Sequence, residues 1–311
     1  MSGPPTTNTP GARVWLALGT IYVVWGSTYL AIAVTVETIP PLLSSGARFV
    51  LAGALLYLLV RWRADEAPKA IHWRSALVVG GLLVGANGVL SVAEQTVPSG
   101  LASLLIATVP FWMVLGASVF FSTRTSRAEW IGIGVGFVGV VVLVGRPAEG
   151  ASLLAVSVVL IASIAWAAGS ILSPRLEAPS STLLAVSMQM LAGGALMLLL
   201  GVMVGEVEDV QLGEFSTSSV VAFFYLVVVS SMIAFPAYIW VLGAAPTSLV
   251  STYAYVNPVI AVMLGTALRN EPLDARLVLG GALIVTAVFV IVTAAARSPK
   301  PAPPPLREAP P

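Results

Sequence analysis

Charged side chains are scarce in this sequence. Asp, Glu, Lys and Arg together make up 9% of the 311 residues, whereas 58% of the residues are hydrophobic. A soluble globular domain has about 25% charged residues, and so little charge cannot cover a water-facing surface. The composition therefore excludes an ordinary soluble domain and indicates a chain whose solvent is lipid.

Cysteine is absent, and histidine occurs once, as His72. Without cysteine the chain has no disulfide framework, no thiolate metal site and no thiol nucleophile. A single histidine, expected in a loop between apolar segments, builds neither a zinc site nor a Ser–His relay. The net charge of +1 gives no indication of nucleic-acid binding. We therefore expect no metal, no cofactor and no nucleic acid.

What the sequence has in quantity is apolar runs of about 20 residues, the length that an α-helix needs to cross about 30 Å of hydrocarbon. We predict an all-α integral membrane protein whose ten transmembrane helices cover residues 13–33, 41–61, 73–93, 98–121, 128–145, 151–173, 182–204, 218–242, 248–268 and 275–296. Only a short turn around residues 96–99 separates the third and fourth runs. Nine helices is therefore the alternative count.

Both ends of the chain are rich in Pro and poor in apolar residues. Residues 1–12 and 297–311 are therefore expected to be disordered tails. The first apolar run is too long, and too poor in basic residues at its start, for a cleaved signal peptide.

Basic residues in the loops predict the orientation of the chain. With the N-terminus in the cytoplasm, the cytoplasmic side holds 11 Lys and Arg residues and the outside holds 3, which with Arg48 inside a span account for all 15. The acidic loop at residues 205–217 also fits the outside. We therefore expect a protein of the inner membrane with both termini in the cytoplasm. This arrangement requires an even number of spans.

The two halves of the sequence resemble each other weakly. At offsets of 141 or 148 residues, similar residues recur at Trp25 and Trp166, Arg48 and Gln189, Pro98 and Pro246, and Pro110 and Pro258. We expect two five-helix repeats, at residues 13–146 and 147–296. Because five is odd, the second repeat would enter the membrane inverted, a recurrent plan of transporters. Chance matches among apolar residues are the alternative.

Several different short motifs follow one another along the chain. They are Trp25-Gly26-Ser27, Pro41 with Arg48 and Gly53, Ala93-Glu94-Gln95, Val97-Pro98-Ser99-Gly100, Ala107-Thr108-Val109-Pro110, and residues 251–258 with Gly265 and Glu271. In combination they resemble the drug/metabolite transporter superfamily, EamA type, and within it the YedA-like subgroup of exporters. The family often has Gly-Glu after the fourth helix, but this chain has Ser122-Thr123-Arg124 there. The resemblance implies a ten-helix bundle with a central cavity lined by both halves, and export of small organic solutes.

Arg48 is the charged residue expected well inside a span. An arginine at the centre of a helix costs about 2.5–3.5 kcal/mol on insertion scales, so it usually faces the bundle interior and has a partner. Either Arg48 attracts an anionic or zwitterionic group of the substrate, or its role is structural. In the structural case it snorkels outward, or it clamps backbone carbonyls and Asn87, which lies at a similar depth. Asn87 and Gln189, the repeat mate of Arg48, are therefore further candidates for the substrate pathway.

Asn257 is expected near the bilayer midplane. The next residue, Pro258, frees a backbone carbonyl of the preceding turn, which is tolerated at that depth where it is buried or lines a cavity. Tyr253 and Tyr255 add polar tips one turn earlier. These residues are candidates to line a cavity, and helix packing is the alternative. Pro258 and its repeat mate Pro110 both predict helix kinks.

Two tryptophans and their neighbouring serines are expected in mirrored halves of the membrane. They are Trp25 with Ser27, and Trp166 with Ser170. This placement suits a pathway with two ends. A buried tryptophan is also a common packing residue, so both interpretations stay open.

Residues 134–139 match the G-x-G-x-x-G pattern of dinucleotide-binding proteins. They lie within an apolar run, with no preceding strand and no acidic residue about 20 positions further on. Together with Gly132 they instead predict a helix face of small residues that packs against another helix.

Carboxylates are not expected at membrane depth. Glu94 and Glu129 fall at the two interfaces, where they would pair with solvent or with loop bases. Exchange of an organic cation for a proton needs an intramembrane carboxylate, so this mechanism is disfavoured.

The sequence thus favours a multipass transporter of a small molecule, with the lipid bilayer as its surroundings. A non-transporting membrane scaffold or sensor is the alternative, and the internal repeat is the feature against it. An intramembrane enzyme is weaker still, because no His or Lys accompanies the scattered Ser residues at depth. Nothing in the sequence indicates an oligomeric state.

Overall fold

The structure is a computed structural model that describes residues 11–62, 67–122, 125–144, 152–245 and 252–297 of the chain. Within these ranges all regular secondary structure is helical. The predicted tails fall almost wholly outside the described residues.

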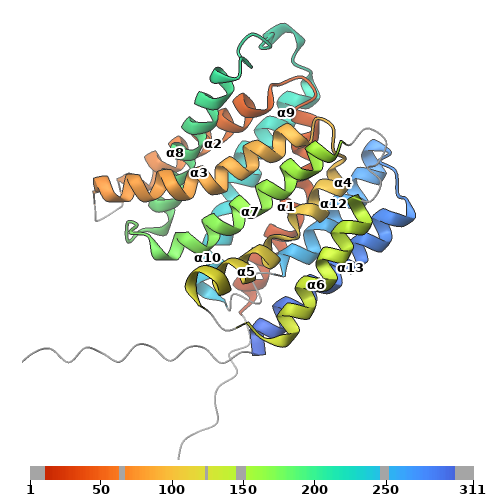
Figure 1. Cartoon of the computed structure of the whole chain (residues 1–311). Coiled ribbons are helices and arrows are strands. Elements are labelled where there is room, and N and C mark those ends of the chain that lie inside the picture. Colours follow the sequence, from red (N-terminus) through yellow and green to blue (C-terminus); the bar gives the residue numbers. More distant parts are fainter. Residues whose placement is uncertain (1–10, 63–66, 123–124, 145–151, 246–251, 298–311) are drawn as a thin grey trace, which may run out of the picture.

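The helices follow the apolar runs of the sequence (Figure 1). They are α1 (Ala12–Thr35), α2 (Pro41–Arg61), α3 (Ala70–Ala93), α4 (Ser99–Ile106), α5 (Val109–Phe121), α6 (Arg127–Val144), α7 (Leu153–Leu172), η1 (Ser173–Arg175), α8 (Thr182–Met203), η2 (Leu212–Glu214), α9 (Thr217–Tyr225), η3 (Leu226–Ala234), α10 (Phe235–Ala244), α12 (Tyr253–Arg269) and α13 (Ala275–Arg297). In the described part of the chain, 8 helical stretches are long and apolar enough to cross a membrane, and Val256–Arg269 is a shorter apolar helix. The described residues thus form an all-helical fold in which 8 helical stretches are long enough to cross a membrane.

Two of the predicted spans consist of consecutive helices. The span at residues 98–121 is divided into α4 and α5, and Pro110 lies in the first turn of α5, where its missing N–H is tolerated. The span at residues 218–242 runs from α9 through the π-helix η3 into α10. A nine-residue π-helix is uncommon, and π-helical turns often occur at functional sites.

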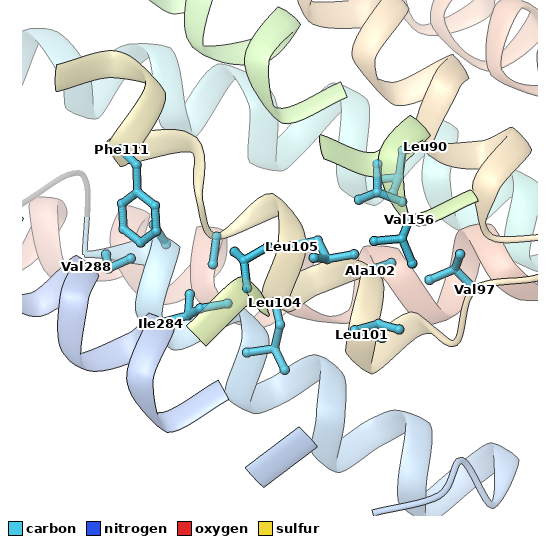
Figure 2. Packing of buried hydrophobic residues seen from close by; sticks show 14 of the residues in the cluster. Leu90, Val97, Leu101, Ala102, Leu104, Leu105, Phe111, Val156, Ile284 and Val288 are labelled. Carbon is cyan, nitrogen blue, oxygen red and sulfur yellow. The ribbon is translucent and has the colours of Figure 1, made fainter. Parts of the chain in front are cut away.

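Helices from the first and second halves of the chain pack against each other in pairs. Helix α2 packs against α8, α6 against α13, and α4 against α12. One apolar cluster is built from α3, α4, α5, α7 and α13 together (Figure 2). The core therefore crosses the boundary between the halves.

The two ends of the bundle differ in charge. One end, here called the acidic end, gathers the last turns of α1, α3, α8 and α12 and the first turns of α2, α4 and α9, with the carboxylates Glu37, Glu94, Glu206, Glu208, Asp209, Glu214, Glu271 and Asp274. The opposite, basic end carries Arg13, Arg61, Lys69, Arg74, Arg127 and Arg175. The start of α1 and the end of α13 lie toward the same side of the bundle, the lower one in Figure 1.

Glycines allow some helices to approach very closely. A Cβ atom at Gly80 of α3 would lie 2.2 Å from the carbonyl oxygen of Gln189 in α8, and one at Gly193 would lie 2.4 Å from the carbonyl oxygen of Gly80. On α6, Cβ atoms at Gly132 and Gly139 would lie 2.6 and 2.9 Å from side chains of α13. These contacts confirm a packing role for Gly132 and Gly139, and Gly136 faces Phe111 of α5, whereas a Cβ atom at Gly134 would meet no neighbour within 4 Å.

His72 lies within α3 and not in a loop as predicted. It is buried in the first turn, where the backbone N–H of Lys69 donates to its Nδ1 at 3.3 Å. The helix begins three residues before the predicted span because this interaction caps its N-terminus.

Candidate functional site

A cavity lies between helices of both halves of the chain. Its volume is about 70 Å³, room for a few water molecules but less than the roughly 300–1,000 Å³ of a typical ligand pocket. A metabolite therefore fits only if the surrounding helices move apart. The cavity is lined by Trp25, Thr28, Tyr29, Ile32, Arg48, Phe49, Ala86, Asn87, Leu90, Ile106, Val109, Trp166, Ser230, Phe235, Tyr253 and Asn257.

Most residues predicted for the substrate pathway meet in this cavity. They are Trp25, Arg48, Asn87, Trp166, Tyr253 and Asn257. Ser27 lies outside the lining, and its hydroxyl is 2.6 Å from the hydroxyl of Tyr225. Gln189 lies outside the lining as well; it is half-buried, and its backbone carbonyl faces Gly80 where α8 meets α3. The side chain of Tyr255 lies outside what the structure describes.

Arg48 is 4% exposed and is the charged residue among the described residues that line the cavity. Its Nε donates to Ser231 Oγ and its Nη2 to Ser230 Oγ, each at 2.9 Å. The third nitrogen, Nη1, is buried and has no hydrogen-bond partner. The predicted clamp on backbone carbonyls and Asn87 is therefore wrong, because hydroxyls of η3 hold the guanidinium. Asn87 instead donates to the carbonyl oxygen of Leu83 at 3.1 Å.

Two consecutive serines of the π-helix η3 hold one guanidinium. The hydroxyls of Ser230 and Ser231 accept hydrogen bonds from two different nitrogens of Arg48. The sequence prediction missed both serines. The signal was a Ser-Ser pair in the middle of an otherwise apolar run.

Aromatic rings form one wall of the cavity. The ring of Trp25 lies 6.0 Å from that of Trp166 and 5.4 Å from that of Tyr253, both in edge-to-face contact. Tyr238 and Phe235 of α10 lie 4.8 and 6.2 Å from Trp25. Such contacts are favourable for aromatic pairs. This wall joins α1, α7, α10 and α12, so movement of any of these helices changes the cavity.

Asn257 is 3% exposed and is held by backbone. In the orientation that its surroundings favour, its amide nitrogen donates to the carbonyl oxygens of Tyr22 and Tyr253, both at 3.3 Å. Helix α12 continues through Pro258 as a single helix. Asn257 therefore ties α12 to α1 at the edge of the cavity.

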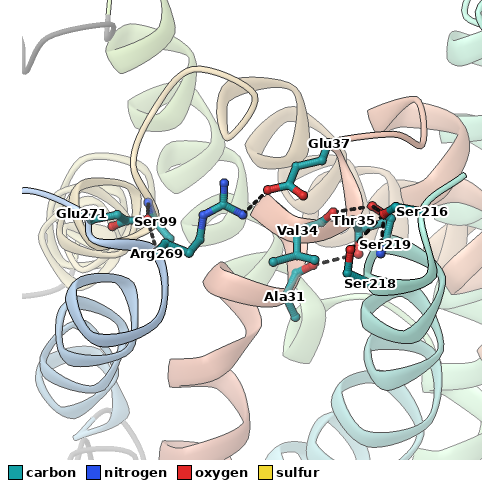
Figure 3. A network of polar contacts seen from close by, with 10 residues as sticks. All are labelled: Ala31, Val34, Thr35, Glu37, Ser99, Ser216, Ser218, Ser219, Arg269 and Glu271. Carbon is teal, nitrogen blue, oxygen red and sulfur yellow. Dashed lines mark hydrogen bonds and ion pairs between the residues drawn. The ribbon is translucent and has the colours of Figure 1, made fainter. Parts of the chain in front are cut away.

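The acidic end is closed by contacts between α1, α4, α9 and α12 (Figure 3). Arg269 at the end of α12 forms an ion pair with Glu37 after α1. Glu271 accepts hydrogen bonds from the backbone N–H groups of Ser99 and Gly100 at 2.9 and 3.0 Å, so it caps α4. Ser219 of α9 donates to the carbonyl oxygen of Val34 at 2.7 Å. We call this set of contacts the acidic-end gate.

Glu94, directly after α3, is 5% exposed, and neither carboxyl oxygen has a hydrogen-bond partner. The expectation that Glu94 pairs with solvent or a loop base is therefore wrong, because the helix ends fold over it. Glu129, at the opposite end, is 8% exposed and accepts a hydrogen bond from the backbone N–H of Ser126 at 2.6 Å.

Known proteins resemble this chain over nearly its whole length. The sequence profile of the EamA-like transporter family matches residues 13–145 and 153–293. The inner membrane transporter YedA of Escherichia coli (strain K12) is 36% identical over 277 residues, which cover 88% of this chain and 89% of that protein. A transporter of Bacillus subtilis, YoaV, is 25% identical over 89% of this chain and 96% of its own length.

A probable amino-acid metabolite efflux pump of Salmonella typhimurium is 27% identical over 88% of this chain and 92% of its own length. One solved crystal structure shares the fold, with a TM-score of 0.63 at 23% identity, over 91% of this chain and 98% of the other.

Proposed function

The chain belongs to the EamA-like transporter family, and from this premise we propose that it exports small organic metabolites or drug-like solutes across the inner membrane by alternating access. Relatives named as inner membrane transporter and as efflux pump support export. A scaffold, a sensor or an intramembrane enzyme is the weaker alternative, because the cavity and the family both favour transport.

The proposal includes ten transmembrane helices arranged as two inverted repeats, at residues 13–146 and 147–296. Contacts at the acidic end support the inversion, because Glu206 after α8 caps the start of α2, and Glu271 after α12 caps the start of α4. Helix α8 therefore ends where its repeat mate α2 begins, and α12 ends where α4 begins. Such mates run in opposite directions, as alternating access by inverted halves requires.

We propose that both termini are cytoplasmic. The basic end, with Arg13, Lys69 and Arg74, then faces the cytoplasm, in accord with the positive-inside rule. The acidic end faces outward. In this orientation the acidic-end gate lies on the outer side, and we take this structure to be the state in which it is closed.

The observation that carries the proposal is the unpartnered Nη1 of Arg48 beside a cavity that both halves line. A buried donor without a partner is costly, and an anionic or zwitterionic solute would satisfy it. We therefore assign Arg48 both a structural role, through Ser230 and Ser231, and a contact with the solute. Trp25, Asn87, Trp166, Tyr253 and Asn257 would line the same path.

The test is counterflow of radiolabelled amino acids, nucleobases, sugars and aromatic cations in proteoliposomes that contain the full chain. We expect at least one solute to be transported, and Arg48→Gln to abolish its transport. Arg127→Gln, the same change at an exposed position of the basic end, is expected to transport normally. Failure of every solute class would contradict the proposed function, and normal transport by a folded Arg48→Gln protein would remove the solute contact.

A further inference from the structure

Glu94 is a buried carboxylate whose neighbours in the chain line two different spaces. Leu90, one turn earlier in α3, lines the central cavity. Gln95, the next residue, lines a groove of about 620 Å³ at the acidic end, together with Glu37, Glu206 and Glu214. Glu94, which lies between Leu90 and Gln95 in the chain, lines neither space and is buried without a hydrogen-bond partner on either oxygen. An ionised carboxylate in such a place loses its hydration with nothing in return.

Several charged and titratable groups face Glu94 from the surrounding helices. Tyr29 lies near it on α1, Arg48 on α2, Arg269 on α12, and Glu271 directly after α12. Helices α4 and α7 contain no titratable residue. Burial first, and the Glu271 carboxylate second, raise the pKa of Glu94 well above its usual range, whereas Arg269 and Arg48 act in the opposite direction.

Two of these charged residues, Arg269 and Glu271, also belong to the acidic-end gate. Arg269 is engaged by Glu37 in an ion pair, and Glu271 is engaged by the start of α4 (Figure 3). Neither group is therefore available to satisfy the Glu94 carboxyl while the gate is closed. Separation of α1 from α12 would break the ion pair with Glu37 and free Arg269 to interact with Glu94.

We propose that Glu94 is a proton-binding site of the acidic-end gate, protonated while the gate is closed and ionised when it opens. On opening, the Glu94 O–H bond breaks and the proton passes to water in the groove. On closure the carboxylate takes a proton back from that water. The gate thus binds a proton each time it closes, and acid on the groove side keeps it closed. This proposal rests on the alternating access proposed above.

Two introduced cysteines can report the gate, because the natural chain has none. Spin labels at Val207→Cys, after α8, and Leu273→Cys, after α12, occupy exposed positions at the acidic end. Their distance is measured by double electron–electron resonance in lipid nanodiscs from about pH 5 to about pH 9, a range that spans usual and raised carboxyl pKa values. We expect a short distance at low pH and a growing population at longer distance as the pH rises.

Glu94→Gln is a neutral copy of the protonated side chain, so its label distance is expected to stay short at every pH. Glu129→Gln removes another buried carboxylate, one with a hydrogen bond and far from the gate, and it is expected to follow the wild-type titration. Should Glu94→Gln fail to fold, Glu94→Asp supplies a second test. It keeps a titratable carboxyl and leaves the contacts that close the gate in place, so its label distance should still depend on pH, with a midpoint that differs from that of wild type. An unchanged midpoint would contradict the role of Glu94.

A Glu94→Gln protein that titrates like wild type would overturn the proposal. So would a wild-type distance that stays constant with pH in a preparation that transports solute, and this outcome would leave the proposed function intact. Loss of transport for every solute would count against the proposed function instead, while the titration would still decide the role of Glu94.

Discussion

Arg48 shows what a single residue reveals in the sequence and what it hides. Its charge within an apolar run was enough to predict a buried side chain that faces the bundle interior, because lipid does not tolerate an exposed guanidinium. Its partners could not be predicted. They lie 182 and 183 residues away in the chain, in a π-helix that no sequence period indicates. The burial of Glu94 near Glu271 and Arg269 could not be predicted either, because these residues are also far from it in the chain.

Ser231→Ala tests how much the hydrogen bond between Arg48 and η3 stabilises the protein. The change leaves Nε of the guanidinium without its acceptor, and we expect a loss of about 0.6–1.7 kcal/mol in the free energy of unfolding, the range of interhelical hydrogen bonds in membranes. Denaturation with sodium dodecyl sulfate measures it. Ser157→Ala is the control, because that hydroxyl is exposed and bonds only within its own helix. Equal stability of the two variants would contradict the assigned role of Ser231.

Glu94 also makes a prediction about stability and pH. Its pKa is raised in the folded protein, so between the pKa of the unfolded state and the higher pKa of the folded state, the folded protein binds more protons than the unfolded protein, and stability falls as pH rises. The contribution is fully present below the unfolded pKa and is lost as pH rises through the folded pKa. Thermal melting across this range should show the fall in wild type and a weaker fall in Glu94→Gln. Identical slopes would show that Glu94 is not the group that titrates.

At the scale of the helices, length was the reliable signal. Apolar runs of about 20 residues predicted where helices lie because a helix must span the hydrocarbon to satisfy its backbone. The break between α4 and α5 falls directly before Pro110, where a kink was predicted, whereas nothing in the sequence predicted the π-helix after Tyr225. The glycine face of α6 was predictable, since small residues at helical spacing permit close packing.

The contact between α3 and α8 depends on Gly80. A methyl group there would meet the backbone oxygen of Gln189 at 2.2 Å, and backbone cannot move aside as a side chain can. We expect Gly80→Ala to lower stability by about 1–3 kcal/mol, the usual cost of overpacking. Gly81→Ala is the matched control, because its nearest neighbour would be a leucine methyl at 3.4 Å. Equal melting temperatures for the two variants would contradict the close approach.

At the scale of the whole molecule, charge decides the orientation. A reporter that is active only outside the cytoplasm should give no activity when fused after Arg297 and high activity when inserted near Asp209. The reason is the excess of Lys and Arg at the basic end, which resists translocation. Alkaline phosphatase fusions expressed in bacteria measure this. The reverse pattern would place both termini outside the cytoplasm and the acidic-end gate on the cytoplasmic side.

The caps supplied by Glu206 and Glu271 have a consequence for biogenesis. Helices α2 and α4 leave the ribosome early, yet the carboxylates that satisfy their first N–H groups are translated more than 160 residues later. Until then these helix starts depend on water or lipid headgroups for hydrogen bonds. We therefore expect the first half on its own to be a poor folding unit, because the groups that cap α2 and α4 belong to the second half.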